Sequence, residues 1–287
     1  MTQVLGMSKF VQVEGNLSTQ KVIGFPVLAI PFNRQVDIII GWAKARLSRF
    51  VCVSNVHMLM EGRWHSDFAQ VLHEADMLTP DGMPLVWMTS IMKGQPQDRV
   101  AGLELMLALC RQAQSQGIGL FFLGSTPEML AKIRCQLSKD FPDLEIAGMV
   151  SPPFRTLSDE EDRAIVNQIN RSGAGLVFVS LGCPKQERWM SLHKGKVSAV
   201  MIGLGGAFSV YAGAQQWAPE WIRANGLEWL YRLMQEPKRL WKRYVSTIPP
   251  FLWLALKQVI KVRLGIAPDA SIRKNWLSAA GRKLSTR

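Results

Sequence analysis

Apolar runs of strand length alternate with amphipathic stretches of helical length through the first two thirds of the chain. Four runs are typical of buried strands, and each is followed by residues whose apolar positions repeat with helical spacing. The four runs are residues 50–56, 119–124, 175–182 and 199–206. Strands separated by helices indicate right-handed βαβ units and therefore a parallel sheet. The pattern predicts an α/β fold: a Rossmann-like parallel sheet flanked by helices.

Several of the predicted helices begin with residues suited to a helix start. Ser125 or Thr126 can cap the helix after the second run, and Pro127 suits its first turn. Pro184 stands at the corresponding place after the third run. The sequence SDEEDRAIVNQI at 158–169 predicts a capping box on a surface helix, so its acidic cluster has a structural role.

A different pattern begins near residue 221. Leu227, Leu230, Tyr231 and Met234 have the spacing of one apolar helical face. Pro237 is expected to end or kink this helix because proline cannot donate a backbone hydrogen bond.

Charge separates the same two regions of the chain, which has 287 residues and a formal net charge of +12. From residue 221 onward there are 14 Lys and Arg against three acidic residues, whereas residues 1–220 hold 20 basic and 19 acidic groups. Six of the ten tryptophans also lie late, from Trp217 onward. We expect an α/β domain over residues 1–220, a basic amphipathic helical appendage over 221–267 and a flexible basic terminus over 268–287.

The apolar run of the appendage, within residues 247–266, is too short to span about 30 Å of hydrocarbon. Tryptophans among cations favour a helix lying on an anionic membrane surface, where each cation contributes about 1 kcal/mol. The structural alternative is a basic helix packed on the body or on a partner subunit, which leaves a homo-oligomer open. A basic, aromatic segment also suits nucleic acid, but the hydrophobic residues 248–256 favour the membrane, and we expect no nucleic acid partner.

Composition argues against several classes of chemistry. The four cysteines are far apart, as in a cytoplasmic protein with reduced thiols, and because the first residues lack a basic stretch followed by an apolar one, we expect no secretory signal. The four histidines form no zinc-binding pattern, and no Walker A, GxSxG or DxD sequence occurs. The stretch GLGGAF at 203–208 fails as a dinucleotide fingerprint because Phe208 replaces the third glycine. We expect no metal and no cofactor.

Glycine-led turns follow two of the predicted strands, LGSTPE at 123–128 and LGCPKQE at 181–187. In parallel sheets ligands bind beyond the carboxyl ends of the strands, where helix N-termini present their amide groups. Because glycine lets a ligand approach the backbone closely, the two turns predict an anion cradle suited to a diphosphate. The alternative is that glycine simply closes tight turns.

Asp81 lies between a proline and a glycine in LTPDGMPLVW and has two interpretations. It could cap the following helix or move a proton during a reaction. Arg99 likewise could form a surface ion pair with Asp98 or Glu104, or stabilise a departing anion. Spacing alone does not choose between them.

Six blocks of sequence together resemble the WecG/TagA/CpsF glycosyltransferase family. In chain order they are NVHMLME, LTPDGMPLVW, RVAGLELM, FFLGSTPEML, SLGCPKQERWM and GLGGAFSVYAGAQQWAPEWIRANGLEWLYRLMQEPKRLWKRY, and together they span roughly residues 25–245, most of the chain. The resemblance implies an inverting, metal-independent transfer of a hexose from a UDP-sugar to a polyprenyl-diphosphate-linked sugar. It also implies a peripheral place on the cytoplasmic face of the inner membrane, in cell-surface or exopolysaccharide synthesis. A non-catalytic scaffold of the same fold is the alternative.

The resemblance implies catalytic roles for three residues. Asp81 would be the general base, Asn55 would lie beside the donor, and Arg99 would contact the sugar or the diphosphate. Many family members carry a threonine two residues before the asparagine, whereas this chain has Val53. A role for that threonine therefore has no counterpart here. Of the donor sugars open to the family, the NVHMLME block favours glucose over N-acetylmannosamine and its uronic acid.

Further positions are expected to bind substrate: Gly124, Ser125, Gly182, Lys185, Gln186, Gly205, Arg232, Arg239 and Arg243. By resemblance, Gln186 would reach the donor sugar while the glycines line the nucleotide cleft. The arginines would approach a diphosphate when the appendage folds over the site at the membrane, with Lys242 a rival of Arg243. Glu187 is expected to be structural because an acid facing a diphosphate would oppose binding.

Overall fold

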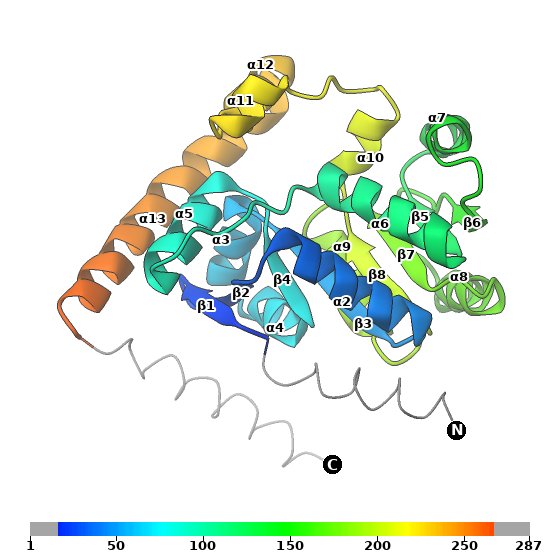
Figure 1. Ribbon diagram of the computed structural model, residues 1–287, viewed down its shortest axis with the longest axis horizontal. Helices are drawn as coiled ribbons and strands as arrows, with labels where there is room; N and C mark the ends of the chain where they lie inside the picture. Colours follow the sequence, from blue (N-terminus) through cyan, green and yellow to red (C-terminus); the bar gives the residue numbers. More distant parts are fainter. Residues whose placement is uncertain (1–16, 267–287) are drawn as a thin grey trace, which may run out of the picture.

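A computed structural model describes residues 17–266, and its centre is one six-stranded sheet (Figure 1). The strands are β3 (Arg49–Ser54), β4 (Met77–Pro80), β5 (Leu120–Gly124), β6 (Ile146–Val150), β7 (Leu176–Ser180) and β8 (Val200–Gly203). Their order across the sheet is β4-β3-β8-β7-β5-β6, and every neighbouring pair is parallel. The expected α/β fold is confirmed. The four predicted strands are β3, β5, β7 and β8, whereas β4 and β6 were missed.

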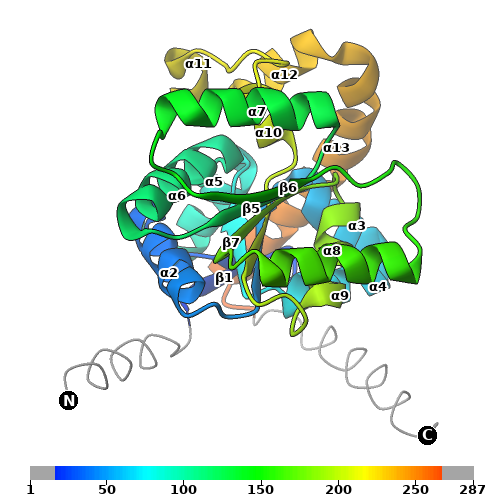
Figure 2. The same ribbon diagram turned by 90° about the vertical axis from the view of Figure 1, so that its right-hand side faces the viewer.

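Helices cover both faces of this sheet because successive strand residues point to opposite sides (Figure 2). Val51 and Val53 face one buried cluster, and Phe50 and Cys52 face the other. The first cluster is covered by α2 (Phe32–Lys44), α6 (Gly102–Gln116), α7 (Pro127–Asp140) and α10 (Gly206–Tyr211). The second is covered by α3 (Val56–Trp64), α4 (Ser66–Glu74), α5 (Met83–Lys93), α8 (Asp159–Arg171) and α9 (Lys185–His193).

Two helix starts have the chemistry that the sequence predicts. Thr126 caps α7 by accepting a hydrogen bond from the backbone N–H of Met129 at 3.2 Å, and Pro127 is the first helical residue. Ser158 and Glu161 form the predicted capping box of α8. These local signals fix where the chain turns from a strand end into a helix.

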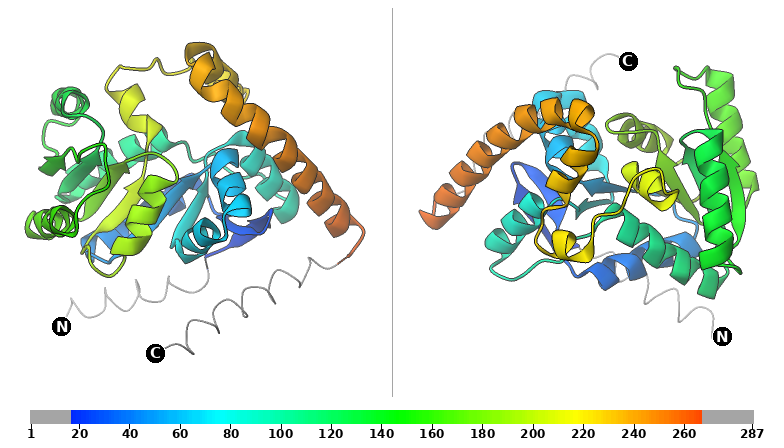
Figure 3. Two further views of the ribbon diagram at one scale, coloured as in Figure 1. Left: turned by 180° about the vertical axis from the view of Figure 1, so that it is seen from behind. Right: turned by 90° about the horizontal axis from the view of Figure 1, so that it is seen from above.

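The appendage is helical and packs on the body. It contains α11 (Glu220–Ala224), α12 (Glu228–Gln235) and the long α13 (Pro237–Arg263), so a helix does end just before Pro237. The predicted apolar face of α12 stays largely in solvent, since none of its residues is buried. By contrast, α13 runs beside α3 and α5 and buries Phe251 and Ala255 in the second cluster (Figure 3).

A two-stranded antiparallel hairpin, β1 (Thr19–Val22) and β2 (Phe25–Leu28), holds α13 near its far end. The backbone N–H of Ile23 donates to Oε1 of Gln258 at 2.8 Å. No helix within residues 17–266 is long and apolar enough to cross a membrane. The domain boundary at residue 220 stays a prediction, and the predicted flexible terminus at 268–287 lies outside the described residues.

Candidate functional site

The predicted site residues on the body lie at one edge of the sheet. Because all six strands are parallel, their carboxyl ends meet there. Asn55 follows β3 and Asp81 follows β4. Gly124 and Ser125 end β5, Gly182, Lys185 and Gln186 follow β7, and Gly205 follows β8. The backbone N–H of Asp81 donates to the carbonyl of Ser54 at 2.9 Å, which places Asp81 next to the start of α3.

The carboxylate of Asp81 faces Arg99 and does not cap a helix. The N-cap of α5 is Gly82, and no side chain caps that helix. Instead, Nη2 of Arg99 lies 3.3 Å from Oδ1 of Asp81, and its Nε donates to the Asp81 backbone oxygen at 2.8 Å. Burial raises the pKa of Asp81, and Glu228 raises it further, whereas Arg99 and Arg232 oppose that rise. A carboxylate in this setting is a stronger proton acceptor than one in water.

Arg99 does not pair with either of its sequence neighbours. Asp98 accepts a hydrogen bond from the first backbone amide of α2, and Glu104 pairs with Arg223 at 2.7 Å. The second partner of Arg99 is Glu228 of α12, whose Oε2 lies 2.8 Å from Nη2. Glu228 stands 129 residues away in sequence, so no local pattern could have revealed it.

Asn55 has a structural bond and a contact to the appendage. Its Oδ1 accepts from the backbone N–H of Met58 at 3.2 Å, which caps α3, and lies 3.4 Å from Nη2 of Arg243. Lys242, the rival of Arg243, is exposed. Burial and the nearby Arg243 lower the pKa of His57 to about 4, so this histidine is neutral at pH 7.

Two arginines of the appendage are gathered here, and the third lies outside. A Cβ atom at Gly206 would stand 2.8 Å from Nη2 of Arg232, so that guanidinium lies against the start of α10. Within residues 17–266, the buried Nε atoms of Arg232 and Arg243 have no hydrogen-bond acceptor. Burial lowers the pKa of Arg243, and the charges of Arg232 and Arg239 lower it further. Arg239 itself is exposed and pairs with Glu236. An anion would relieve this crowding of positive charge.

The ends of β5, β7 and β8 are joined through the backbone. Gly124 has φ of 107°, and a Cβ there would stand 2.3 Å from the carbonyl oxygen of Ser180, so only glycine fits. Ser125 has φ of 66°, and its N–H donates to the same oxygen at 3.0 Å. The hydroxyl of Ser180 donates to the carbonyl of Gly205 at 3.0 Å. This part of the edge therefore presents backbone with few side chains.

Gln186 is a large buried side chain that lies against that backbone. A Cβ at Gly203 would stand 2.9 Å from its Nε2, which donates to Oε1 of Glu187 at 2.7 Å. Its own Oε1 is buried without a partner among the described residues. Glu187 is fully buried, and burial raises its pKa to about 7. Lys185 is exposed at the first position of α9.

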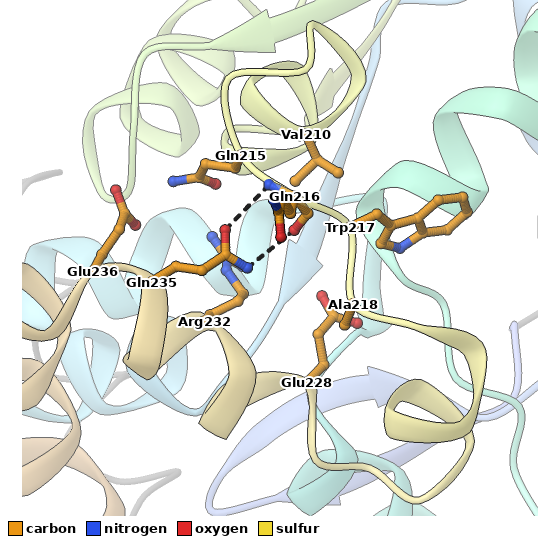
Figure 4. Close-up of a pocket in the computed structure, with 9 residues that line it drawn as sticks. All are labelled: Val210, Gln215, Gln216, Trp217, Ala218, Glu228, Arg232, Gln235 and Glu236. Atoms are coloured by element: carbon orange, nitrogen blue, oxygen red, sulfur yellow. Dashed lines mark hydrogen bonds between the residues drawn. The ribbon is translucent and has the colours of Figure 1, made fainter.

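Glu228 and Arg232 also line a narrow crevice between α12 and the loop after α10 (Figure 4). Its free volume of about 10 Å³ leaves room for about one water molecule. Gln216 and Gln235 close it with two hydrogen bonds of 3.1 Å. Within residues 17–266, no three His, Cys, Asp or Glu side chains gather in a way that could hold a metal ion.

Comparison with known proteins supports the resemblance. The profile of the glycosyl transferase WecG/TagA/CpsF family matches residues 20–264. The N-acetylglucosaminyldiphosphoundecaprenol N-acetyl-beta-D-mannosaminyltransferase of Bacillus subtilis 168 is 34% identical over 194 residues, 67% of this chain and 73% of that protein. The protein of the same name from Bacillus spizizenii W23 is 32% identical over 209 residues, covering 72% and 79%. The one from Staphylococcus aureus MW2 is 28% identical over 215 residues, covering 75% and 82%.

Proposed function

This chain belongs to the WecG/TagA/CpsF family of glycosyltransferases, and on that premise we propose that it moves a hexose from a UDP-sugar to a polyprenyl-diphosphate-linked saccharide. The named relatives act on a sugar joined to diphosphoundecaprenol, which supports an acceptor of this class. The observation that carries the proposal is the placement of Asp81. It lies at the carboxyl edge of a parallel sheet, facing Arg99 and near Arg232, whose buried Nε atom has no acceptor among the described residues.

In the proposed reaction Asp81 is the general base. It takes the proton from the acceptor hydroxyl while that oxygen attacks the anomeric carbon of the donor. The bond from that carbon to UDP breaks on the opposite face, so the configuration inverts. A positioned base contributes on the order of 10²–10⁴-fold to the rate. The raised pKa of Asp81 supports the role because it makes the carboxylate a better proton acceptor.

The leaving diphosphate would be held by protein cations, with no metal. Arg232 and Arg243 can each offer the diphosphate a charge-assisted hydrogen bond from a guanidinium that has an unused donor. Backbone around Gly124 and Gly205 would line the nucleotide, and Oε1 of Gln186 would accept from a donor hydroxyl. Arg239 would need to release Glu236 before it could reach the anion.

The outer side of α13 fits an anionic membrane surface on the cytoplasmic face. Trp241 and Trp253 are 50% and 58% exposed, and Leu252 and Leu256 are similarly open. Lys257 lies 4.4 Å above the Trp253 ring. Because Phe251 anchors the opposite side of the helix in the core, this outer side can meet lipid without unfolding the appendage. Co-sedimentation with anionic vesicles, and no retention on DNA at physiological salt, is expected.

The test is UDP release by the full chain in the presence of anionic vesicles and EDTA. UDP-glucose and UDP-N-acetylmannosamine are supplied with polyprenyl-diphosphate-linked mono- and disaccharides. One donor and acceptor pair should release UDP and yield a product of inverted anomeric configuration. The NVHMLME block favours glucose, whereas the names of the relatives favour N-acetylmannosamine. Absence of UDP release with every pair would contradict the proposal, and loss of turnover in EDTA would contradict its metal-independent form.

A further inference from the structure

Glu228 of the appendage binds the same guanidinium as Asp81. Its Oε2 accepts from Nη2 of Arg99 at 2.8 Å, and that same nitrogen lies 3.3 Å from Oδ1 of Asp81. About a fifth of each of the three side chains is exposed, namely 22% of Asp81, 17% of Arg99 and 21% of Glu228. One cation is thus shared by two carboxylates in a partly desolvated place. Each ion pair of Arg99, with Asp81 and with Glu228, is therefore stronger than an ion pair on the open surface.

The position of Glu228 is fixed by contacts at both ends of α12. Before the helix, Gly226 has φ of 71°, and a Cβ there would stand 2.8 Å from Cγ of Met83 on α5. At its end, Gln235 exchanges two hydrogen bonds with the backbone of Gln216 (Figure 4). Glu228 therefore contacts Arg99 from a helix that tertiary contacts hold in place.

An acidic residue in the first turn of a helix is common because it favours the helix dipole. Glu228 occupies that place in α12, whose N-cap residue, Leu227, provides no side-chain cap. That preference alone would leave the carboxylate in solvent near the amides of its own helix. Here it is directed across to Arg99 on the body, so a second role is needed to explain its contact.

We infer that Glu228 is a positioning residue that divides Arg99 between two carboxylates, so that seating of α12 leaves Asp81 only partly neutralised and available as a base. The inference rests on the proposed function, in which Asp81 accepts the proton. Without Glu228, Arg99 would pair with Asp81 alone, and the base would be held more tightly as an ion pair.

The charge of Glu228 should therefore influence the pH dependence of the reaction. The charged groups that face Asp81 are Arg99, from the connection before α6, and Glu228 and Arg232, from α12. Glu228 raises the pKa of Asp81, so its neutralisation lowers that pKa. Because the base works when ionised, the acidic limb of kcat/KM then moves to lower pH. The plateau of kcat falls, on the order of threefold to tenfold, since a weaker base accepts the proton less readily.

Three variants of the full chain test this. Glu228→Gln keeps the shape and removes the charge, whereas Glu228→Asp keeps the charge. Glu220→Gln is the matched control because Glu220 is an exposed first-turn acid of α11 in the same appendage. Glu228→Gln should move the acidic limb of the kcat/KM profile to lower pH. It should also lower kcat and leave the KM for the donor unchanged. Glu228→Asp should keep the wild-type limb, and Glu220→Gln should match the wild type throughout.

Hydrogen exchange provides a second readout that does not depend on turnover. Glu228→Gln should increase the exchange rate of the amides of α12 and of those around Asp81 and Arg99 at least threefold, and Glu220→Gln should not. The inference is overturned if Glu228→Gln exchanges like the wild type, or if Glu228→Asp shifts the limb as far as Glu228→Gln. A wild-type chain that releases no UDP would instead contradict the proposed function, and the exchange result would then show only whether Glu228 holds α12 on the body.

Discussion

The carboxyl edge of the sheet has two halves, one rich in charged side chains and one rich in glycine. The charged half lies at β3 and β4 and contains Asn55, Asp81 and Arg99, together with Glu228, Arg232 and Arg243 of the appendage. The glycine half lies at β5, β7 and β8 and contains Gly124, Ser125, Ser180, Gly182 and Gly205. One half acts through side-chain charge, and the other through backbone that a ligand can approach closely.

In the proposed reaction the two halves have different roles: the charged half carries proton transfer and charge stabilisation, and the glycine half shapes the site and binds substrate. Charges near Asp81 set how readily a proton leaves the acceptor and how well the departing diphosphate is stabilised. The glycine half is expected only to shape and bind, because the nearby carboxylate of Glu187 is fully buried and accepts a hydrogen bond from Gln186. Substitutions of Asp81 should therefore change kcat, those of the arginines in the charged half should change affinity for the diphosphate, and those in the glycine half should change stability and KM.

The largest effect is expected at Asp81. Asp81→Asn removes the proton acceptor and should lower kcat by about 10²–10⁴-fold while the fold is kept. The matched control is Asp37→Asn, an exposed aspartate on α2. UDP release at saturating donor and acceptor measures both variants. Turnover of Asp81→Asn close to that of the control would remove Asp81 from the mechanism.

A smaller effect, on stability alone, is expected at Glu187. Burial raises its pKa from 4.5 to about 7, so the stability it contributes is fully present below pH 4.5 and is lost as pH rises through 7. Glu187→Gln has no carboxylate to ionise and so avoids that loss. Between pH 4.5 and pH 7 its free energy of unfolding should therefore rise by about 3 kcal/mol relative to that of the wild type. Urea unfolding at pH 4.5 and pH 8 measures it.

The control for Glu187 is Glu160→Gln, an exposed glutamate on α8. It should follow the wild-type pH dependence. Glu187→Gln should also keep kcat, because its amide oxygen can still accept the bond from Gln186. If the free energies of unfolding of Glu187→Gln and the wild type differ by the same amount at pH 4.5 and pH 8, burial does not raise the pKa of Glu187.

The smallest effect expected is the difference between two glycines of the glycine half. Both Gly124 and Gly182 have positive φ, 107° and 80°, so alanine is strained at either. Only at Gly124 would the new Cβ also meet a backbone oxygen, at 2.3 Å, whereas Gly182 has nothing within 4 Å. Gly124→Ala should be less stable than Gly182→Ala by about 2 kcal/mol. Equal unfolding midpoints of Gly124→Ala and Gly182→Ala would show that the close approach of Gly124 to the Ser180 backbone does not constrain the glycine half.

Much of the fold could be predicted because its central strands are strongly apolar. Residues 50–56 cover all of β3 except Arg49, and residues 175–182 contain β7; both strands are buried on both faces. β4 was not predicted because its last residue is Pro80, and the next two are Asp81 and Gly82, so the strand has the composition of a turn where it ends. β6 was not predicted because Ala147 and Gly148, in the middle of Ile146–Val150, have weak strand preference, and the strand is only half-buried at the edge of the sheet.

The site could be predicted only as far as local sequence defines it. The turn glycines and Asp81 are local features that end strands. The partners of Arg99 are not, because Glu228 lies 129 residues away and Asp81 lies 18 residues away. The sequence equally allowed Asp98 and Glu104 as partners, and only packing shows that an α2 amide and Arg223 already occupy them.

The central claim is that the charged half separates chemistry, at Asp81, from diphosphate binding, at the arginines. Calorimetric titration of UDP into Asp81→Asn and Arg243→Gln, with EDTA present, tests it most directly. Asp81→Asn should bind UDP at least as tightly as the wild type, because a negative charge near the diphosphate is gone. Arg243→Gln should bind tenfold to a hundredfold more weakly, on the order of the loss of one charge-assisted hydrogen bond. Loss of UDP binding in Asp81→Asn, or wild-type affinity in Arg243→Gln, would contradict the account.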